Sequence, residues 1–387
     1  MCASPIIEAR ERFGRLFPSG AVPGVARAPG RVNLIGEHTD YNEGFVMPMA
    51  LDLHVAVAFA PRTDRIIRAH SVAVNETREM DLKGLAPPGG TEWFDYVAAV
   101  AWALADAGEA VSGADMVVSG NVPIGAGLSS SAALEMAVAR ALCHSSGIGW
   151  DPPRMAQIGR RAENVFVGVN CGIMDQFAAA ASRAGCALLL DCRSLETEPI
   201  EIPDEVTFVV LDTGARRALS DSAYNERRAS CEKVVDVLQK RDRAIRSLRD
   251  VSPAFLDSME PLLDAQSYRR AAHVVAETRR PHVLAENLGA QDFDAAGRVM
   301  NESHFSLRDL YEVSSPELDA MTEAARGSPG CFGARMTGAG FGGCAVALVD
   351  SSRIDAFMTE VGAQYTSRTG RQGWCHICTP SAGADLV

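Results

Sequence analysis

A glycine-rich loop that leads straight into a helix is the feature that most limits how this chain can fold. Residues 121–135 (NVPIGAGLSSSAALE) hold two glycines, three serines and then the pattern of a helix from about 130 to 144. Backbone amides and the dipole at such a helix start bind phosphate. The loop lacks both the GK[ST] of a P-loop and the G-x-G-x-x-G of a dinucleotide site. Its local chemistry is therefore equally typical of a phosphate site and of an ordinary serine cap.

A second glycine-containing segment crowds charged side chains together. Within residues 28–44 (APGRVNLIGEHTDYNEG), Arg31, Glu37, His38 and Asp40 fall inside ten positions. Carboxylates at this density suit a polyhydroxylated ligand such as a sugar, because each can accept hydrogen bonds from hydroxyl groups. The same residues are also typical of a solvated polar turn. A metal site is a weaker reading, since no second His or Cys stands at ligand spacing.

A third segment, residues 336–344 (MTGAGFGGC), contains four glycines between two apolar runs. Such a cluster lets the backbone approach another group closely, or it simply forms a tight hairpin.

Strand and helix patterns alternate along the chain, which favours an α+β protein with two lobes. We expect strands at 54–59, 115–119, 186–190, 206–211, 331–336, 344–349 and near 373–377. We expect helices at 93–107, 130–144, 153–167, 218–239, 267–287, 293–302, 316–325 and after 352. The polar segment 193–203 (RSLETEPIEIP) predicts a boundary, so that one domain spans 1–195 and the other 196–387.

Composition and charge narrow the class of protein further. The net charge of −12 argues against a nucleic-acid partner, and the longest apolar stretch, near 97–105, is too short to span a membrane. The ten cysteines do not suggest a disulfide framework, and the lone CxxC at 375–378 has no second pair to complete a zinc site. Without a basic, apolar leader, the sequence predicts a reduced, cytoplasmic protein.

Taken together and in this order, the three segments resemble the three motifs of the GHMP small-molecule kinases. GRVNLIGEHTDYNEG is similar to the galactokinase signature, and so are the segments 171–177 (CGIMDQF), 191–197 (DCRSLET) and 302–319 (ESHFSLRDLYEVSSPELD). The resemblance covers nearly the whole chain. It implies a ribosomal-S5-domain-2-like N-terminal lobe and a ferredoxin-like C-terminal lobe, with the active site between them.

The resemblance also implies an activity: transfer of the ATP γ-phosphate to the anomeric hydroxyl of galactose, with Mg²⁺ as cofactor. Separately, we expect a monomer. The catalytic residues would be Arg31 and Asp175. The sugar-binding residues would be Glu37, His38, Asp40, Gly172, Asp175 and Tyr224. The ATP-binding residues would be Pro123, Gly125, Ala126, Gly127, Leu128, Ser129, Ser130, Ser131, Gly338 and Gly340. Ser131 and Glu163 would hold Mg²⁺. Asp175 would act either as a general base or by electrostatic stabilisation.

Two positions depart from the family pattern, and several alternatives stay open. Ala339 and Glu43 stand where glycine, or for Glu43 glutamine, is common in relatives. An N-acetylgalactosamine kinase would carry cysteine in place of Asn42. Arabinose, mevalonate and homoserine kinases lack the full GEHTDYN string. A sensor that binds galactose and ATP without transfer would be expected to lose a transfer residue.

Overall fold

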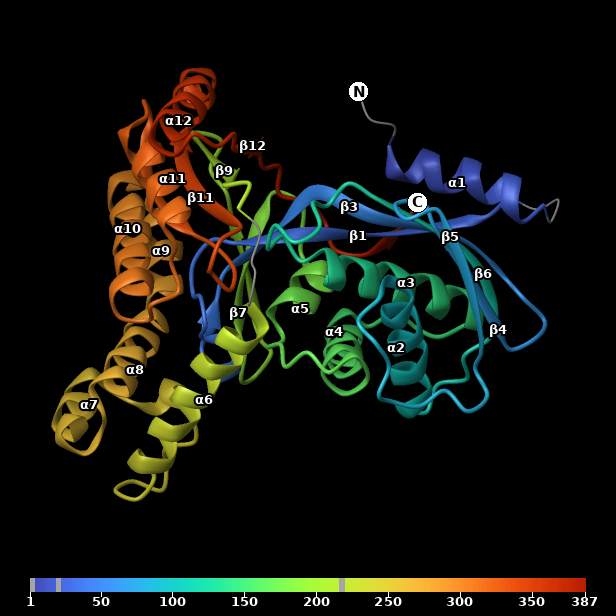
Figure 1. Cartoon of the computed structure of the whole chain (residues 1–387), viewed down its shortest axis with the longest axis horizontal. Helices are drawn as coiled ribbons and strands as arrows, with labels where there is room; N and C mark the ends of the chain where they lie inside the picture. The colour runs from blue at the N-terminus through green and yellow to red at the C-terminus, as the bar shows by residue number, and fades with distance from the viewer. Residues whose placement is uncertain (1–3, 19–21, 216–219) are drawn as a thin grey trace.

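A six-stranded sheet forms the centre of the N-terminal half in the computed structural model, which describes residues 4–18, 22–215 and 220–387 (Figure 1). Its strand order is β13-β1-β3-β6-β4-β5, and only β4 and β6 pair in parallel. The strands are β1 (Gly24–Asn33), β3 (Pro48–Pro61), β4 (Ile66–Ser71), β5 (Glu76–Asp81), β6 (Ala114–Gly120) and β13 (Asp385–Leu386). Most residues of β1 and β3 are buried, because helices cover the sheet.

Helices lie on both faces of this sheet (Figure 1). On one face lie α2 (Trp93–Asp106), α3 (Ser130–Ser146), α4 (Pro152–Arg161) and α5 (Met174–Ala181), and on the other lies α1 (Pro5–Leu16). Helix α3 is the central one, since it contacts both β1 and β3. Its many buried alanines allow a close approach to the sheet. The start of α3 is thereby fixed beside β1.

The C-terminal half contains a second sheet with the order β10-β11-β9-β12. The strands are β9 (Val206–Asp212), β10 (Cys331–Met336), β11 (Cys344–Asp350) and β12 (Trp374–Ile377). Packed near it are α10 (Phe293–Asp309), α11 (Pro316–Gly327) and α12 (Ile354–Thr369), and α9 (Arg280–Gly289) lies beside α10 (Figure 1). Helices α6 (Ser220–Leu238), α7 (Pro253–Met259) and α8 (Ala265–Glu277) extend away from this group.

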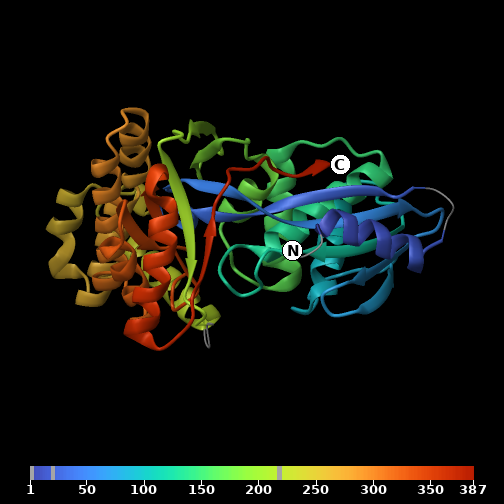
Figure 2. The same ribbon diagram turned by 90° about the horizontal axis from the view of Figure 1, so that it is seen from above.

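A small third sheet joins the halves, with β2 (Phe45–Val46), β7 (Cys186–Asp191) and β8 (Thr197–Glu201) in the order β2-β7-β8. After β12 the chain runs back along the N-terminal half, where β13 pairs with β1 (Figure 2). The α+β class is therefore confirmed. The division into 1–195 and 196–387 stays a prediction, with β8 inside the expected boundary and β13 returning to the first sheet.

Most expected elements are present, and the differences have local causes. The helix expected at 153–167 is α4 followed by a π-helical segment, Ala162–Val167. The helix expected at 267–287 is wrong as one element: α8 ends at Glu277 and α9 begins at Arg280, because Pro281 has no N–H to continue the ladder. Residues 218–219 of the expected helix 218–239 lie outside the described residues. Within the described ranges, none of the helices combines the length and apolar character that crossing a membrane requires.

Candidate active site

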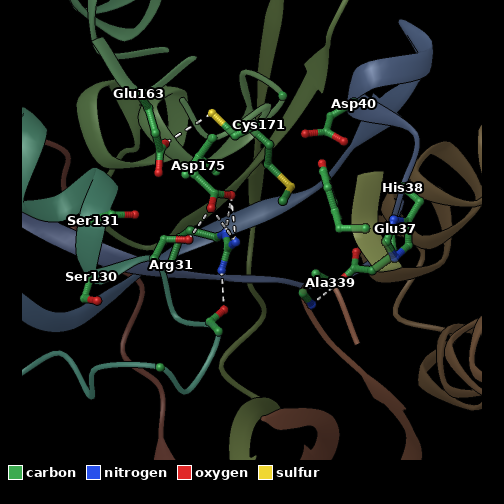
Figure 3. Close-up of a pocket in the computed structure, with 18 of the residues that line it drawn as sticks. Arg31, Glu37, His38, Asp40, Ser130, Ser131, Glu163, Cys171, Asp175 and Ala339 are labelled. Atoms are coloured by element: carbon green, nitrogen blue, oxygen red, sulfur yellow. Dashed lines mark hydrogen bonds and ion pairs between the residues drawn. The ribbon is translucent and has the colours of Figure 1, made fainter. Parts of the chain in front are cut away.

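A cavity of about 480 Å³ lies where the three glycine-containing segments converge (Figure 3). Its wall includes the end of β1, the loop before α3, the first turn of α5 and the loop after β10. Most of the predicted site residues line it: Arg31, Glu37, His38, Asp40, Gly125, Gly127, Ser129, Ser130, Ser131, Glu163, Gly172, Asp175, Tyr224 and Gly338. Segments more than 300 residues apart in sequence, such as Glu37 and Gly338, thus meet at one site.

The loop before α3 is seated directly on β1. The amide of Arg31 donates to the carbonyl of Leu128 at 3.1 Å. A Cβ on Gly30 would lie 2.7 Å from the same carbonyl oxygen, so a side chain there would push the loop away. Gly127 and Ser129 adopt positive φ angles of 84° and 57°, which bend the chain into the helix start.

Arg31 and Asp175 form the charged centre of the cavity (Figure 3). Two guanidinium nitrogens of Arg31 donate to the two carboxylate oxygens of Asp175, each at 2.7 Å. The third nitrogen donates to the carbonyl of Gly127 at 2.7 Å, and the Ser129 hydroxyl donates to Asp175. This two-pronged geometry fixes both side chains. A cation and a carboxylate are thereby held together beside the helix start.

Glu37 is held from the C-terminal half. Its carboxylate accepts the backbone amide of Gly338 at 2.6 Å and the side-chain amide of Asn33, and it lies 3.4 Å from the guanidinium of Arg335. Burial raises the pKa of Glu37, and the charge of Arg335 opposes that rise. Arg335 is fully buried and also donates to the carbonyls of Asn33 and Leu34. The glycine-rich segment 336–344 thus helps to fix the position of Glu37 in segment 28–44 through the amide of Gly338.

Asp40 and Gly172 are in direct contact across the cavity. A Cβ on Gly172 would lie 1.7 Å from an Asp40 carboxylate oxygen, a distance that no side chain could occupy. Burial and the neighbouring charge of Asp175 raise the pKa of Asp40 to about 6. Two carboxyl groups facing one space favour a ligand that brings hydroxyl donors.

His38 and Tyr224 close another wall, with their ring centroids 5.8 Å apart. His38 has a positive φ of 65°, and its Nδ1 lies 2.8 Å from the hydroxyl of Tyr41. Burial lowers the pKa of His38 well below its ordinary value, so the ring is neutral. Its Nε2 is buried and has no hydrogen-bond partner within the described part of the chain.

Ser131 and Glu163 supply oxygen atoms to the same end of the cavity. Ser131 lies in the first turn of α3, and Glu163 lies in the π-helical segment. The carboxylate of Glu163 accepts hydrogen bonds from the side chains of Gln176 at 2.6 Å and Cys171 at 3.2 Å. The hydroxyl of Ser131 also donates a hydrogen bond to it. Burial raises the pKa of Glu163. A hydroxyl and a carboxylate are ligands that suit Mg²⁺, which keeps several waters and phosphate oxygens. No group of three His, Cys, Asp or Glu residues suited to a metal occurs among the described residues.

Some predicted residues lie off the cavity wall, and some wall residues were not predicted. Pro123, Ala126, Leu128 and Gly340 do not line the cavity; a Cβ on Gly340 would lie 2.2 Å from the Val313 carbonyl, so this glycine serves packing. The wall residues without a predicted role are Tyr96, Val169, Cys171, Met174 and Ala339. Cys171 adjoins Gly172 in the CGIMDQF segment, so a signal for it was present in the sequence.

The two departures from the family pattern are accommodated differently. In the third segment the positive φ angles fall on glycines and on Phe341, so Ala339 carries no such strain. Glu43 does adopt a positive φ of 57°, and its carboxylate accepts from Arg193 at 2.6 Å.

Comparison with known proteins identifies the class. A model described as the galactokinase galactose-binding signature matches residues 11–61, and models of the GHMP kinase N-terminal and C-terminal domains match residues 95–183 and 284–367. The chain is 46% identical to a galactokinase of Chloroflexus aurantiacus, over 94% of this chain and 93% of the relative. It is 45% identical to a galactokinase of Roseiflexus sp., over 98% and 97% of the two chains.

Solved structures agree with the sequence relatives. The galactokinase of Lactococcus lactis complexed with galactose superimposes with a TM-score of 0.93 and 34% identity, covering 98% of both chains. The mevalonate kinase of Methanococcus jannaschii shares only the fold, with a TM-score of 0.64 and 18% identity over 94% of this chain and 99% of that one. The fold and the cavity define a small-molecule kinase of the GHMP class. Within that class, the chain belongs to the galactokinase family, as its signature segment predicts.

Proposed function

We propose that this protein transfers the γ-phosphate of ATP to the anomeric hydroxyl of galactose, giving galactose 1-phosphate and ADP. The observation that supports this most is the pairing of Arg31 with Asp175 beside the glycine and serine loop. A phosphate group bound at the loop and a sugar held by Glu37, His38, Asp40, Gly172 and Tyr224 would meet at this pair. Family membership supports the same reaction.

In the proposed reaction, the anomeric oxygen forms a bond to the γ-phosphorus. The bond between that phosphorus and the bridging oxygen breaks, and ADP leaves with the electron pair. Asp175 accepts the hydroxyl proton or stabilises the charge as the proton departs, and Arg31 sits next to it to neutralise the phosphoryl oxygens. Phosphoryl transfer of this kind is accelerated mostly by positioning and charge neutralisation.

The proposed phosphate site uses the loop backbone rather than a P-loop lysine. The chain has lysine only at positions 83, 233 and 240, and none of these residues lines the cavity. Gly125, Gly127, the N-cap residue Ser129 and the first two residues of α3, Ser130 and Ser131, line it instead. Gly338, from the C-terminal half, borders the same cavity, and its amide donates a hydrogen bond to Glu37. Amides at a helix start favour bound phosphate.

Ser131 and Glu163 are the proposed Mg²⁺ ligands. They fit the ion because their oxygens lie together at the phosphate end of the cavity. Mg²⁺ supplies charge neutralisation at the phosphate oxygens when it is bound. Glu163 would then exchange its contacts with Cys171 and Gln176 for the ion.

The remaining proposals concern the protein's surroundings. We propose a monomer that works in the cytoplasm, without a nucleic-acid or membrane partner. The acidic net charge of −12 supports the absence of a nucleic-acid partner. Sedimentation of the purified protein tests the monomer, and a dimer at micromolar concentration would contradict it.

The direct test follows product formation by phosphorus NMR with purified protein, ATP, Mg²⁺ and a panel of acceptors. The panel contains galactose, N-acetylgalactosamine, glucose, arabinose and mevalonate. We expect a sugar 1-phosphate from galactose and at least a roughly tenfold lower kcat/KM for every other acceptor, equivalent to one lost hydrogen bond in the transition state. A preference for another acceptor, or no product at all, would contradict the proposal.

A further inference from the structure

A chain of hydroxyl groups connects the sugar-facing histidine to the C-terminal half. The Tyr41 hydroxyl lies 2.8 Å from Nδ1 of His38 and 2.7 Å from the hydroxyl of Tyr311. The Tyr311 hydroxyl in turn lies 3.3 Å from the sulfur of Cys231. His38 and Tyr41 come from the signature segment, whereas Tyr311 follows α10 and Cys231 belongs to α6. This row of hydrogen-bonding groups therefore connects the N-terminal half of the molecule to the C-terminal half.

Tyr311 is fixed from several sides. It is fully buried, its amide donates to the carbonyl of Ser306 at 3.0 Å, and its own carbonyl accepts from Arg227 at 2.9 Å. The ring of His273 lies against it, with centroids 4.7 Å apart. A side chain held this way keeps its hydroxyl in one place, so it can impose an order on the groups it contacts.

The other end of the chain is an unmatched nitrogen. Nε2 of His38 is buried and has no hydrogen-bond partner of good geometry within the described residues, although the backbone of Ala339 interacts with the His38 ring and raises its pKa slightly. Both residues belong to the cavity wall. Burial, together with His273 and Arg227, keeps the pKa of His38 low and the ring neutral. A neutral imidazole carries one proton, on either Nδ1 or Nε2, and the choice decides whether Nε2 donates or accepts.

Counting protons along the chain leaves two arrangements, because each hydroxyl and the thiol has a single hydrogen. In the first, Cys231 donates to Tyr311, Tyr311 to Tyr41, and Tyr41 to Nδ1 of His38. In the second, every donor is reversed, and the chain ends with a phenol donating to a thiol sulfur. A phenol is a stronger donor than a neutral imidazole, and an imidazole nitrogen is a stronger acceptor than a phenol oxygen or a thiol. The first arrangement is therefore favoured.

We propose that Tyr41, ordered by Tyr311, holds His38 in the tautomer with its proton on Nε2, so that His38 donates a hydrogen bond to an oxygen of the bound sugar. Tyr41 and Tyr311 are then positioning residues, and the carboxylates of Glu37 and Asp40 are the acceptors that complete the sugar site. The site is thus complementary to a ligand with an oxygen acceptor opposite His38 and hydroxyl donors opposite Glu37 and Asp40. This inference rests on the proposed function, because it takes the cavity to hold a sugar.

The tautomer is measured without any activity. Two-bond proton–nitrogen correlation spectra of protein labelled with ¹⁵N-histidine separate protonated from bare ring nitrogens, and the signals of His38 are identified by their loss in His38→Gln. We expect a protonated Nε2 in the wild-type protein and a detectable share of the Nδ1-protonated form in Tyr41→Phe. A wild-type ring protonated on Nδ1, or on both nitrogens, would overturn the proposal even if galactose phosphorylation is confirmed.

Kinetics provide the second arm, with Tyr365→Phe as the matched control. Tyr365 is also a fully buried tyrosine whose hydroxyl donates to the carbonyl of Thr213 at 2.7 Å, and it does not line the cavity. We expect Tyr41→Phe to raise the KM for galactose roughly tenfold, the cost of one hydrogen bond, and Tyr311→Phe to raise it less. The KM for ATP should stay within about twofold of the wild-type value, since the loop amides are untouched. Equal effects of Tyr41→Phe and Tyr365→Phe on the KM for galactose would show a merely structural role and overturn the proposal.

Discussion

Both carboxylate oxygens of Asp175 accept hydrogen bonds from Arg31, so the two charges at the centre of the cavity have one fixed geometry. Changing Asp175→Asn would replace one acceptor by an NH₂ group facing the guanidinium. We expect turnover to fall by roughly 10²–10⁴-fold, the usual cost of losing a proton-transfer group, while the fold is retained. Asp355→Asn is the matched control, because Asp355 also lies in the first turn of a helix but is exposed. Product formation and thermal unfolding of both variants check this, and near-normal turnover of Asp175→Asn would contradict it.

The contact between Gly172 and Asp40 leaves no space for a methyl group. A Cβ at position 172 would lie 1.7 Å from one Asp40 oxygen and 2.3 Å from its Cγ, so the carboxylate must move. We expect Gly172→Ala to raise the KM for galactose at least roughly tenfold and to destabilise the fold by about 1–3 kcal/mol. Gly362→Ala in α12 is the control, since nothing lies within 4 Å of the added atom. Equal KM values for the two variants would refute the steric argument.

The raised pKa of Asp40 has a consequence for stability. Its folded carboxyl titrates near 6 and its ordinary value is 3.8, so the folded protein binds more protons between these pH values. Stability from this group is therefore present below about pH 4 and is lost as the pH rises towards 6. We expect Asp40→Asn to stabilise the sugar-free protein by about 1–3 kcal/mol at pH 7.5, and by less at pH 5. Urea unfolding at both pH values measures this, and an equal difference at both would disagree with it.

Arg335 and Glu37 are a buried pair whose separation should be costly. The side chain of Arg335 is fully buried, and its guanidinium lies 3.4 Å from the carboxylate of Glu37. We expect Arg335→Met to destabilise the protein by about 3–5 kcal/mol, because Glu37 would be left as an uncompensated buried charge. The double variant Arg335→Met/Glu37→Gln should recover part of that loss. If the double variant is as unstable as the sum of the two single variants, the pair is not coupled.

Glu163 should control the requirement for Mg²⁺. EDTA is expected to abolish turnover, and Glu163→Gln to raise the Mg²⁺ concentration for half-maximal turnover by roughly tenfold or more, because a neutral amide is a weaker ligand. Glu135 is a useful comparison, since it is buried and accepts from the same Gln176 but does not line the cavity. Magnesium titrations of Glu163→Gln and Glu135→Gln test this, and an unchanged requirement in Glu163→Gln would remove it as a ligand.

Local patterns were sufficient for much of the fold. The loop before α3 and the helix itself were predicted because the glycines, serines and apolar positions act within a few residues of one another. The break between α8 and α9 is not predicted, although Pro281 lies within the expected helix. Pro281 stands in the first turn of α9, a position where proline is common because the N–H that it lacks would have no partner there. Helix α1 was not predicted at all, and it depends on packing of Phe13 and Ala9 against the sheet.

The site divides in the same way. Arg31, Asp175 and the serines at the start of α3 are predicted from the resemblance of short segments, and they line one cavity. Arg335 was not predicted, because its partner Glu37 is almost 300 residues away and neither periodicity nor spacing connects the two. The order of the hydroxyl groups beyond His38 likewise depends on Tyr311 being brought beside Tyr41 by tertiary packing.

The pairing of β13 with β1 bears on how this protein is made. Asp385 is held to Arg27 by two hydrogen bonds across 358 positions of sequence, and Leu386 pairs with Ala26, so the outer strand of the first sheet is synthesised long after the strand that it covers. While the chain is being synthesised, the backbone of β1 stays unpaired on that side, and an unpaired edge can associate with another nascent chain. Pairing of residues 385–386 with β1 therefore also closes the edge through which partly synthesised copies could aggregate.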